Sequence, residues 1–261
     1  LTGKAISFLE KHKAEPFFLF YSTHDIHVPR VPHKRFAGKT TMGPRGDALV
    51  DRYWNVRELL KKLEALGLAK NTIVLFSSDN GPVVDDGYKD DAVTKLGGHK
   101  PAGPLRGGKY SNFEGGTRVP LIARWPLRIK PGVSDALIGQ HDFFASFASL
   151  TNQRLAADAA PDSFDVLPGL LGEAKKGREW IIEHARNLSM RKGEYKMIEA
   201  GPGPAIQVNT NTETGAAPSP QLYRVTTDPG ERTNLAAQMP DKVAELGALL
   251  NTVRSSPRSR P

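Results

Sequence analysis

The chain has 261 residues, of which 39% are hydrophobic and 25% charged, so it can form one large α/β domain or a domain with a small appendage. Its 36 Lys and Arg residues against 28 Asp and Glu residues give a formal net charge of +8, which indicates either solubility or attraction to anionic substrates. The lack of Cys excludes disulfides and thiolate metal sites, scattered basic residues argue against nucleic-acid binding, and no apolar run is long enough for a membrane span.

Helical and strand-like patterns alternate in the first part of the chain. Residues 1–13 have helical spacing without an initial Met, which indicates a helix already under way and a fragment of a longer protein. A strand-like run at residues 16–21, a helix at 47–66 and a second strand-like run at 73–76 follow. Strands joined through a helix are expected to be parallel, with their carboxyl ends at one edge of the sheet, so polar residues after both strands should share a cleft.

The pattern changes in the last third of the chain. A third strand at residues 119–126 and a short helix at 142–151 precede a weakly patterned linker. Short strands without intervening helices then predict an antiparallel sheet, followed by a helix at 241–253. The strands are expected at residues 180–182, 195–198 and 221–225, and the domain division is expected at 1–177, 178–254 and a tail of 255–261.

Asp79 and Asn80 follow the second strand and are the candidate metal ligands. Their hard oxygens suit Ca²⁺, with Mg²⁺ as a second possibility. A carboxylate and a neutral amide bind the cation without cancelling its charge, so the cation can still attract an anionic ester. Two ligands leave a Ca²⁺ shell of six to eight positions incomplete, and an Asx turn that merely ends the strand is the alternative interpretation.

His27 is the candidate general acid. It follows the strand-like run at residues 16–21 and precedes Val28-Pro29, which rigidifies the turn. Its imidazole can protonate a leaving oxygen near neutral pH. His24 lies three residues away, and the sequence does not separate the two.

Lys109 follows two glycines, which allow its backbone and ammonium group to approach an anionic ligand closely. A lysine held against a charged oxygen stabilises a transition state electrostatically, although an ordinary solvated lysine is the alternative. Arg106 is a further candidate substrate contact, and a structural ion pair with Glu114 is its preferred interpretation. His99 and Lys100 lie in a polar loop, where substrate contact and a simple surface position are equally compatible with the sequence.

Taken together, these motifs resemble the type I sulfatase (arylsulfatase-like) family of the alkaline phosphatase superfamily, and the resemblance covers nearly the whole chain. The motifs are Pro16-Phe-Phe-Leu-Phe-Tyr with His27-x-Pro29, Ser78-Asp79-Asn80-Gly81-Pro82, Leu105-Arg-Gly-Gly-Lys109, Phe113-Glu114-Gly-Gly-Thr-Arg118-Val-Pro120, and Leu222-Tyr223 with Asp228-Pro229-Gly230-Glu231 and Asn234-Leu235.

The resemblance implies an α/β fold: the C-terminal part of an alkaline-phosphatase-like, mostly parallel mixed sheet with flanking helices, plus a small antiparallel sheet and helix. It implies sulfate ester hydrolysis by a formylglycine nucleophile beside Ca²⁺. Asp79 and Asn80 match metal ligands, Lys109 matches the sulfate-binding lysine, and His27 matches the histidine that assists the leaving alcohol. His24, His99, Lys100 and Arg106 are further substrate candidates. The implied substrate is a sulfated carbohydrate or an aryl sulfate, and the implied location is periplasmic or secreted.

The sequence departs from this family at the nucleophile. The formylglycine motif, Cys or Ser followed by x-Pro-x-Arg, is absent, and the nearest match at residues 255–259 has Ser in place of the Arg. The early Asp pair is also absent. We therefore expect the N-terminal half of the fold to be missing and this piece alone to be inactive. The alternatives are a phosphoester or phosphonate hydrolase of the same superfamily and a non-catalytic glycan-binding remnant.

Overall fold

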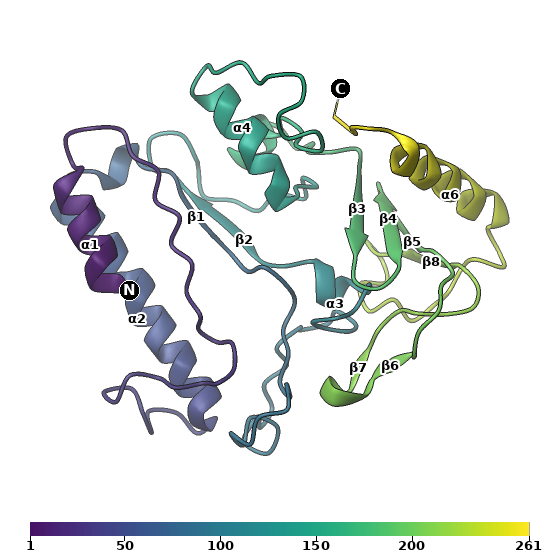
Figure 1. The fold of residues 1–261 in the computed structure, drawn as a ribbon, viewed down its shortest axis with the longest axis horizontal. Helices are drawn as coiled ribbons and strands as arrows, with labels where there is room; N and C mark the ends of the chain where they lie inside the picture. Colours follow the sequence, from purple (N-terminus) through teal and green to yellow (C-terminus); the bar gives the residue numbers. More distant parts are fainter. Residues whose placement is uncertain (261) are drawn as a thin grey trace. The chain divides into compact units, whose positions relative to one another are not determined.

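The computed structural model describes residues 1–260 and has the mixed α/β class that the sequence predicts (Figure 1). The chain forms two compact units. The helical unit comprises Leu1–Val74, Val83–Pro101 and Arg124–Leu127. The sheet unit comprises Leu75–Pro82, Ala102–Ala123 and Arg128–Pro261. The sequence predicts a division near residue 178 from a change in the strand pattern, whereas these units are defined by compactness. The predicted division stays a prediction.

Two helices organise the helical unit: α1 (Thr2–Lys11) and α2 (Gly43–Ala65). Apolar residues at helical spacing place Leu9 and Leu63 in a shared core with Ala69 of the short 3₁₀ helix η1 (Ala69–Asn71). The sequence thus predicts α1 and the body of α2 correctly.

Helix α2 begins four residues before the predicted start at Asp47. Pro44 lies in its first turn, where a missing N–H costs no helical hydrogen bond. The buried carboxylate of Asp47 accepts hydrogen bonds from the backbone N–H groups of Gly38 (2.7 Å) and Thr40 (2.9 Å). Asp47 therefore ties down the preceding loop.

The predicted strand at residues 16–21 is not a strand among the described residues. Its side chains nevertheless alternate as in a half-buried strand. Phe17 and Leu19 pack against the core of the helical unit, whereas Phe18 and Phe20 are 72% and 81% exposed. The segment has strand-like periodicity without the ladder of hydrogen bonds that defines a strand, so the predicted parallel pairing stays untested.

The predicted strands at 73–76 and 119–126 are confirmed as β1 (Val74–Ser77) and β2 (Leu121–Arg124), which form a two-stranded sheet. The larger, four-stranded sheet is antiparallel, as predicted, in the order β3-β4-β5-β8. Its strands are β3 (Trp180–His184), β4 (Leu188–Lys192), β5 (Tyr195–Ile198) and β8 (Gln221–Arg224).

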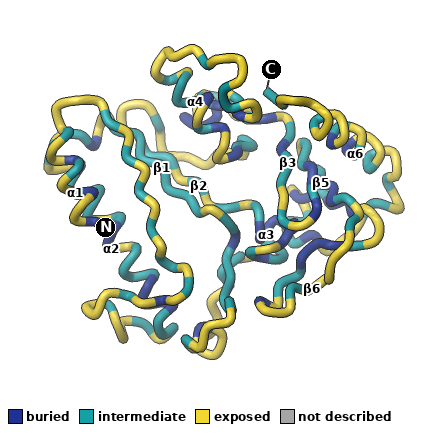
Figure 2. The backbone as a smooth tube through the Cα atoms, viewed as in Figure 1, coloured by how far each residue is buried: buried dark blue, intermediate teal, exposed yellow. Residues whose placement is uncertain are grey.

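Helix α6 (Pro240–Ser255) packs against the four-stranded sheet. The core between them contains Met190, Met197, Leu222, Leu246 and Leu250. The tube is dark blue along β5 because three of its four residues are buried (Figure 2). This core explains why the C-terminal segment folds into a sheet and a helix rather than a series of loops.

The remaining elements are short. They are α3 (Glu114–Thr117), η2 (Gln140–Asp142), α4 (Phe143–Leu150), α5 (Leu167–Leu170), β6 (Ile206–Gln207), η3 (Val208–Thr210) and β7 (Thr212–Glu213). No helix within residues 1–260 is both long and apolar enough to cross a membrane.

Candidate active site

The predicted site residues are divided between the two units. The helical unit carries His24, His27, His99 and Lys100, and the sheet unit carries Asp79, Asn80, Arg106 and Lys109.

Asp79 and Asn80 lie in the loop that leaves β1, as the sequence predicts. Asp79 is exposed and Asn80 is half-buried. The side-chain N–H of Asn80 donates to the carbonyl oxygen of Gly81 at 2.9 Å. With the amide nitrogen engaged in this way, Oδ1 is the Asn80 atom suited to coordinating a cation.

This pair fits part of a Ca²⁺ site. A carboxylate and an amide oxygen on consecutive residues are hard ligands of the right kind, but Ca²⁺ takes six to eight oxygens. Within residues 1–260, no group of three or more His, Cys, Asp and Glu side chains could hold a metal ion. The donor chemistry therefore suits the cation, and further ligands are required to complete its shell.

Four glycines lock the loop of Asp79 and Asn80 to the loop of Lys109. We call Gly81, Gly108, Gly115 and Gly116 the glycine knot. A Cβ atom on Gly81 would lie 1.9 Å from the carbonyl oxygen of Gly115, and one on Gly116 would lie 2.5 Å from that of Gly108. At these distances no other residue type fits without moving backbone, which accounts for the glycines of the sequence motifs.

Backbone hydrogen bonds complete the knot. The N–H of Gly81 donates to the carbonyl oxygen of Gly116 at 2.9 Å, and the N–H of Lys109 donates to that of Pro82 at 2.9 Å. The structure thus brings the backbone of Lys109 beside the loop that carries Asp79 and Asn80. The ammonium group of Lys109 lies 5.2 Å from the centroid of the Tyr110 ring.

Arg106 pairs with Glu213, so the predicted ion pair with Glu114 is wrong. Its Nη2 and Nε atoms lie 2.6 and 2.9 Å from the two carboxylate oxygens of Glu213, and its Nη1 donates to the carbonyl oxygen of Glu231 at 2.8 Å. The hydrogen bond from Arg106 holds the pKa of Glu213 below its ordinary value. The sequence could not show this pairing because Glu213 lies 107 residues away along the chain.

Glu114 belongs instead to a buried charge cluster. Its fully buried carboxylate lies 3.1 Å from Nζ of Lys196 and 3.3 Å from Nη1 of Arg191. Lys196 is also fully buried and lies 2.6 Å from the carboxylate of Glu183. Burial alone would raise the pKa of Glu114, but Lys196, Arg191 and Arg118 outweigh it and hold that pKa below its ordinary value. The cluster ties α3 to strands β3, β4 and β5.

Glu231 is a fully buried residue that sequence reasoning did not single out. Its Oε2 atom accepts a hydrogen bond from the backbone N–H of Glu114 at 2.6 Å. Burial raises the pKa of Glu231 to about 7, although Lys196 and the Glu114 N–H oppose that shift. Glu231 appeared in the sequence only within the motif Asp228-Pro229-Gly230-Glu231, and no local pattern marks a carboxylate as buried.

His27 is exposed, and its Nδ1 atom lies 2.7 Å from the carbonyl oxygen of Val28. Because a carbonyl only accepts, Nδ1 is the donor in this contact. His24 is also exposed and lies 3.8 Å from the carboxylate of Asp25. His99 and Lys100 are exposed in the polar loop, as predicted.

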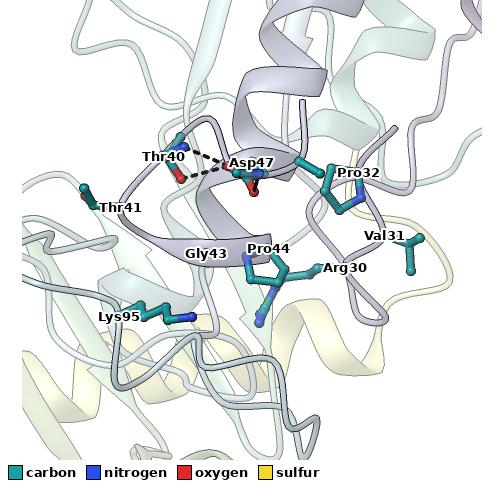
Figure 3. Close-up of a pocket in the computed structure, with 11 residues that line it drawn as sticks. Arg30, Val31, Pro32, Thr40, Thr41, Gly43, Pro44, Asp47 and Lys95 are labelled. Carbon is teal, nitrogen blue, oxygen red and sulfur yellow. Dashed lines mark hydrogen bonds between the residues drawn. The ribbon is translucent and has the colours of Figure 1, made fainter. Parts of the chain in front are cut away.

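A pocket of about 500 Å³ lies at the start of α2 in the helical unit (Figure 3). Arg30, Asp47 and Lys95 contribute its charged lining groups. Arg30 is already paired with Asp90 at 2.7 Å, and Asp47 accepts the hydrogen bonds from the preceding loop. In the described chain, none of the eight predicted site residues lines this pocket.

Comparisons with known proteins identify the family. The family model named Sulfatase matches residues 1–153. An N-acetylgalactosamine-6-O-sulfatase of Bacteroides thetaiotaomicron is 49% identical over 257 residues, which cover 98% of this chain and 50% of that protein. Human arylsulfatase A is 32% identical over 234 residues, covering 84% of this chain and 44% of that protein. The chain thus spans about half the length of these relatives.

Solved structures agree with these sequence comparisons. A Bacteroides thetaiotaomicron sulfatase structure, from work on the metabolism of multiple glycosaminoglycans, matches with a TM-score of 0.96 at 49% identity, covering 98% of this chain and 54% of that one. A Pseudoalteromonas sulfatase shares the fold, with a TM-score of 0.77 at 24% identity over 99% of this chain and 53% of that one. The resemblance seen in the motifs is therefore confirmed, and the chain belongs to the sulfatase family.

Proposed function

We propose that this chain supplies part of the active site of a sulfuric ester hydrolase that acts on sulfated carbohydrate. The observation that carries the proposal is the glycine knot. It joins the loop of Asp79 and Asn80 to the loop of Lys109 in a chain that belongs to the sulfatase family. A cation-binding loop and a lysine held by the same packing suit an anionic ester, because both attract the negative charge of the sulfate group.

Each residue has a proposed role. Asp79 and Asn80 provide two oxygen ligands to Ca²⁺, which when bound attracts the sulfate oxygens. Lys109 faces a charged sulfate oxygen and stabilises the transition state. His27 donates a proton from Nε2 to the leaving alcohol oxygen, while its Nδ1 proton stays with the carbonyl of Val28.

Four further residues are proposed to contact the rest of the substrate: His24, His99, Lys100 and Arg106. Three of these side chains are exposed and able to reach a ligand. Arg106 is different, because its three side-chain nitrogens already donate hydrogen bonds to Glu213 and Glu231. Its proposed contact with substrate is therefore indirect, through the position of its loop.

The nucleophile is proposed to be a formylglycine on a segment of the sulfatase fold outside these 261 residues, which contain no matching motif. Two observations support a further segment of the same fold. The relatives are about twice as long as this chain, and residues 16–21 expose Phe18 and Phe20 on a strand-like segment. Exposed aromatic side chains of this kind are suited to being covered by a further segment of the protein.

The proposed substrate is a 6-O-sulfated N-acetylgalactosamine within a glycosaminoglycan. Its support is the similarity to the N-acetylgalactosamine-6-O-sulfatase of Bacteroides thetaiotaomicron, which is 49% identical over almost the whole chain.

The proposal is tested by assaying the complete gene product with 6-O-sulfated N-acetylgalactosamine and with the corresponding phosphate ester. We expect release of inorganic sulfate and a clear preference for the sulfate ester. The 261-residue chain assayed by itself should release none, because its sequence contains no nucleophile motif. The variant Lys109→Met in the complete protein should lower kcat/KM by two or more orders of magnitude, as expected for the loss of a charge that stabilises the transition state.

Two results would replace this proposal. A preference for the phosphate ester would assign the protein to the phosphoester or phosphonate hydrolases. Binding of the sulfated sugar by the complete protein, with no release of sulfate, would indicate a glycan-binding protein without catalysis.

A further inference from the structure

The carboxylate of Glu231 is buried beside the loops of the proposed site without being part of it. One oxygen, Oε2, accepts the backbone N–H of Glu114 at 2.6 Å. The other, Oε1, is buried and has no hydrogen-bond partner among the described residues. Leaving a buried carboxylate oxygen unpaired destabilises the protein, so the position of this residue calls for an explanation beyond stability.

A continuous set of hydrogen bonds leads from Glu231 to the proposed site. Glu114 begins α3, and the next residue, Gly115, donates to the carbonyl oxygen of Arg106 at 2.7 Å. Within the same turn, the carbonyl oxygen of Gly116 accepts the N–H of Gly81 at 2.9 Å. The four residues of α3 therefore connect to both loops of the glycine knot.

The turn is too short to hold this position by its own hydrogen bonds, because a four-residue helix leaves most of its N–H groups without helical partners. Groups from later in the chain hold it instead. Lys196 of β5 and Arg191 of β4 bind the side chain of Glu114, and Glu231 binds its backbone. The side-chain anchor fixes the end of a carboxylate, whereas the bond from Glu231 fixes the backbone from which the knot is built.

We propose that Glu231 is a positioning residue: by accepting the Glu114 N–H, it fixes α3 and, through the glycine knot, the loops that carry Asp79, Asn80 and Lys109. The value of this positioning for catalysis rests on the proposed function. The link from Glu231 to the loops of the glycine knot can be tested without measuring activity. The acceptor oxygen, rather than the negative charge or the volume of the side chain, is the feature that matters.

Hydrogen exchange of individual amides, measured by NMR on this chain, tests the link. Glu231→Met keeps most of the volume and removes the acceptor, and Glu231→Gln keeps both volume and an acceptor oxygen. We expect Glu231→Met to speed exchange of the Gly81 and Lys109 amides by at least about tenfold and Glu231→Gln to keep them near wild type. Amides of the four-stranded sheet should be unchanged in both variants.

Glu199→Met is the matched control. Glu199 also uses a carboxylate oxygen to accept a backbone N–H in the sheet unit, that of Leu188 at 2.8 Å. Its loss should speed exchange near Leu188 and leave Gly81 and Lys109 unchanged. Uniformly faster exchange in Glu231→Met would show a general loss of stability and overturn the proposal. Unchanged exchange at Gly81 and Lys109 would overturn it as well.

The same three variants in the complete gene product separate this inference from the proposed function. We expect Glu231→Met to lower kcat by about tenfold or more with a smaller change in KM, and Glu231→Gln to restore most of the rate. A wild-type protein that hydrolyses no sulfate ester would refute the proposed function, while the exchange data would still decide the role of Glu231. An active wild type with equal rates in all variants would refute the positioning role.

Discussion

Residues 17–21 and strand β5 are similar segments that the fold treats differently. Both are short and extended, but half-buried positions alternate with exposed ones in residues 17–21, whereas three of the four residues of β5 are buried. Strand β5 pairs with β4 on one side and β8 on the other, and it buries even a lysine, Lys196. Residues 17–21 have no strand partner among the described residues, and two of their phenylalanines face outward. The comparison shows that strand propensity decides backbone shape, whereas neighbouring segments decide what is buried.

The largest expected loss of stability comes from removing the buried charge of Lys196 in β5. Lys196→Met leaves the buried Glu114 and the half-buried Glu183 without their shared cation, and we expect a loss of about 3–5 kcal/mol in the free energy of unfolding. Lys192→Met on the neighbouring strand removes a partly exposed lysine paired with Glu245 and should change stability by less than about 1 kcal/mol. Chemical denaturation of both variants measures the difference. Equal effects would show that the buried cluster does not hold the sheet unit together.

The raised pKa of Glu231 predicts one part of how the stability of the folded protein depends on pH. Its pKa is about 7 in the folded protein against an ordinary value of 4.5, so the folded state binds more protons between these values. The contribution of Glu231 to stability therefore falls as pH rises from 4.5 to about 7 and is level above that range. Glu231→Gln removes this penalty, and its stability gain over wild type should grow from about zero at pH 4 to at most about 3 kcal/mol at pH 8. Denaturation at several pH values measures the gain, and a gain independent of pH would contradict the prediction.

A smaller effect is expected in residues 17–21, where a packed side chain, Leu19, can be compared with an exposed one, Phe20. Leu19 packs against the core of the helical unit, so Leu19→Ala should cost about 1–2 kcal/mol. Phe20 is 81% exposed, so Phe20→Ser should leave the stability of this chain within about 0.5 kcal/mol. The same Phe20→Ser change in the complete protein should be clearly destabilising if another segment covers this face. Thermal unfolding of both forms of the protein tests this, and a neutral effect in both would argue against a covering segment.

The smallest expected effect concerns Arg106. Arg106→Lys keeps the charge but loses the two-pronged bond to Glu213, and we expect a loss of about 1 kcal/mol. Arg106→Lys combined with Glu213→Gln forms a double-mutant cycle that isolates the pair. Additive effects in that cycle would show that the two side chains do not stabilise one another.

Much of the fold follows from local pattern, and much of the site does not. Helix α2 and strands β1, β3, β5 and β8 show apolar residues at helical or strand spacing, so the sequence predicts them. Strand β4 was missed because Ser189, Arg191 and Lys192 make it polar, although Ser189 and Met190 are fully buried. Its burial depends on the strands at either side, which local periodicity does not reveal.

The candidate site shows the same limit. Residue chemistry and position after a strand single out Asp79, Asn80 and Lys109, and the backbone contact of their loops is present in the structure. The long-range partners of Arg106 and Glu114 lie between 77 and 125 residues away in sequence, since Arg191 is 77 residues from Glu114 and Glu231 is 125 residues from Arg106. Pairings over such distances depend on the folded topology, so the sequence assigned Arg106 to the wrong carboxylate.

The knot of glycines also bears on how members of such a family can diversify. The chain leaves the sheet unit after Pro82 and returns at Ala102, and Gly81 and Lys109 pin the backbone near both ends of that excursion. With both ends held, doubling the length of a flexible loop adds only about 0.6 kcal/mol to the entropic cost of closing it. Evolution or protein engineering can therefore lengthen, shorten or replace residues 83–101 at little cost in loop-closure entropy, while the hydrogen bonds of Gly81 and Lys109 hold the chain on either side.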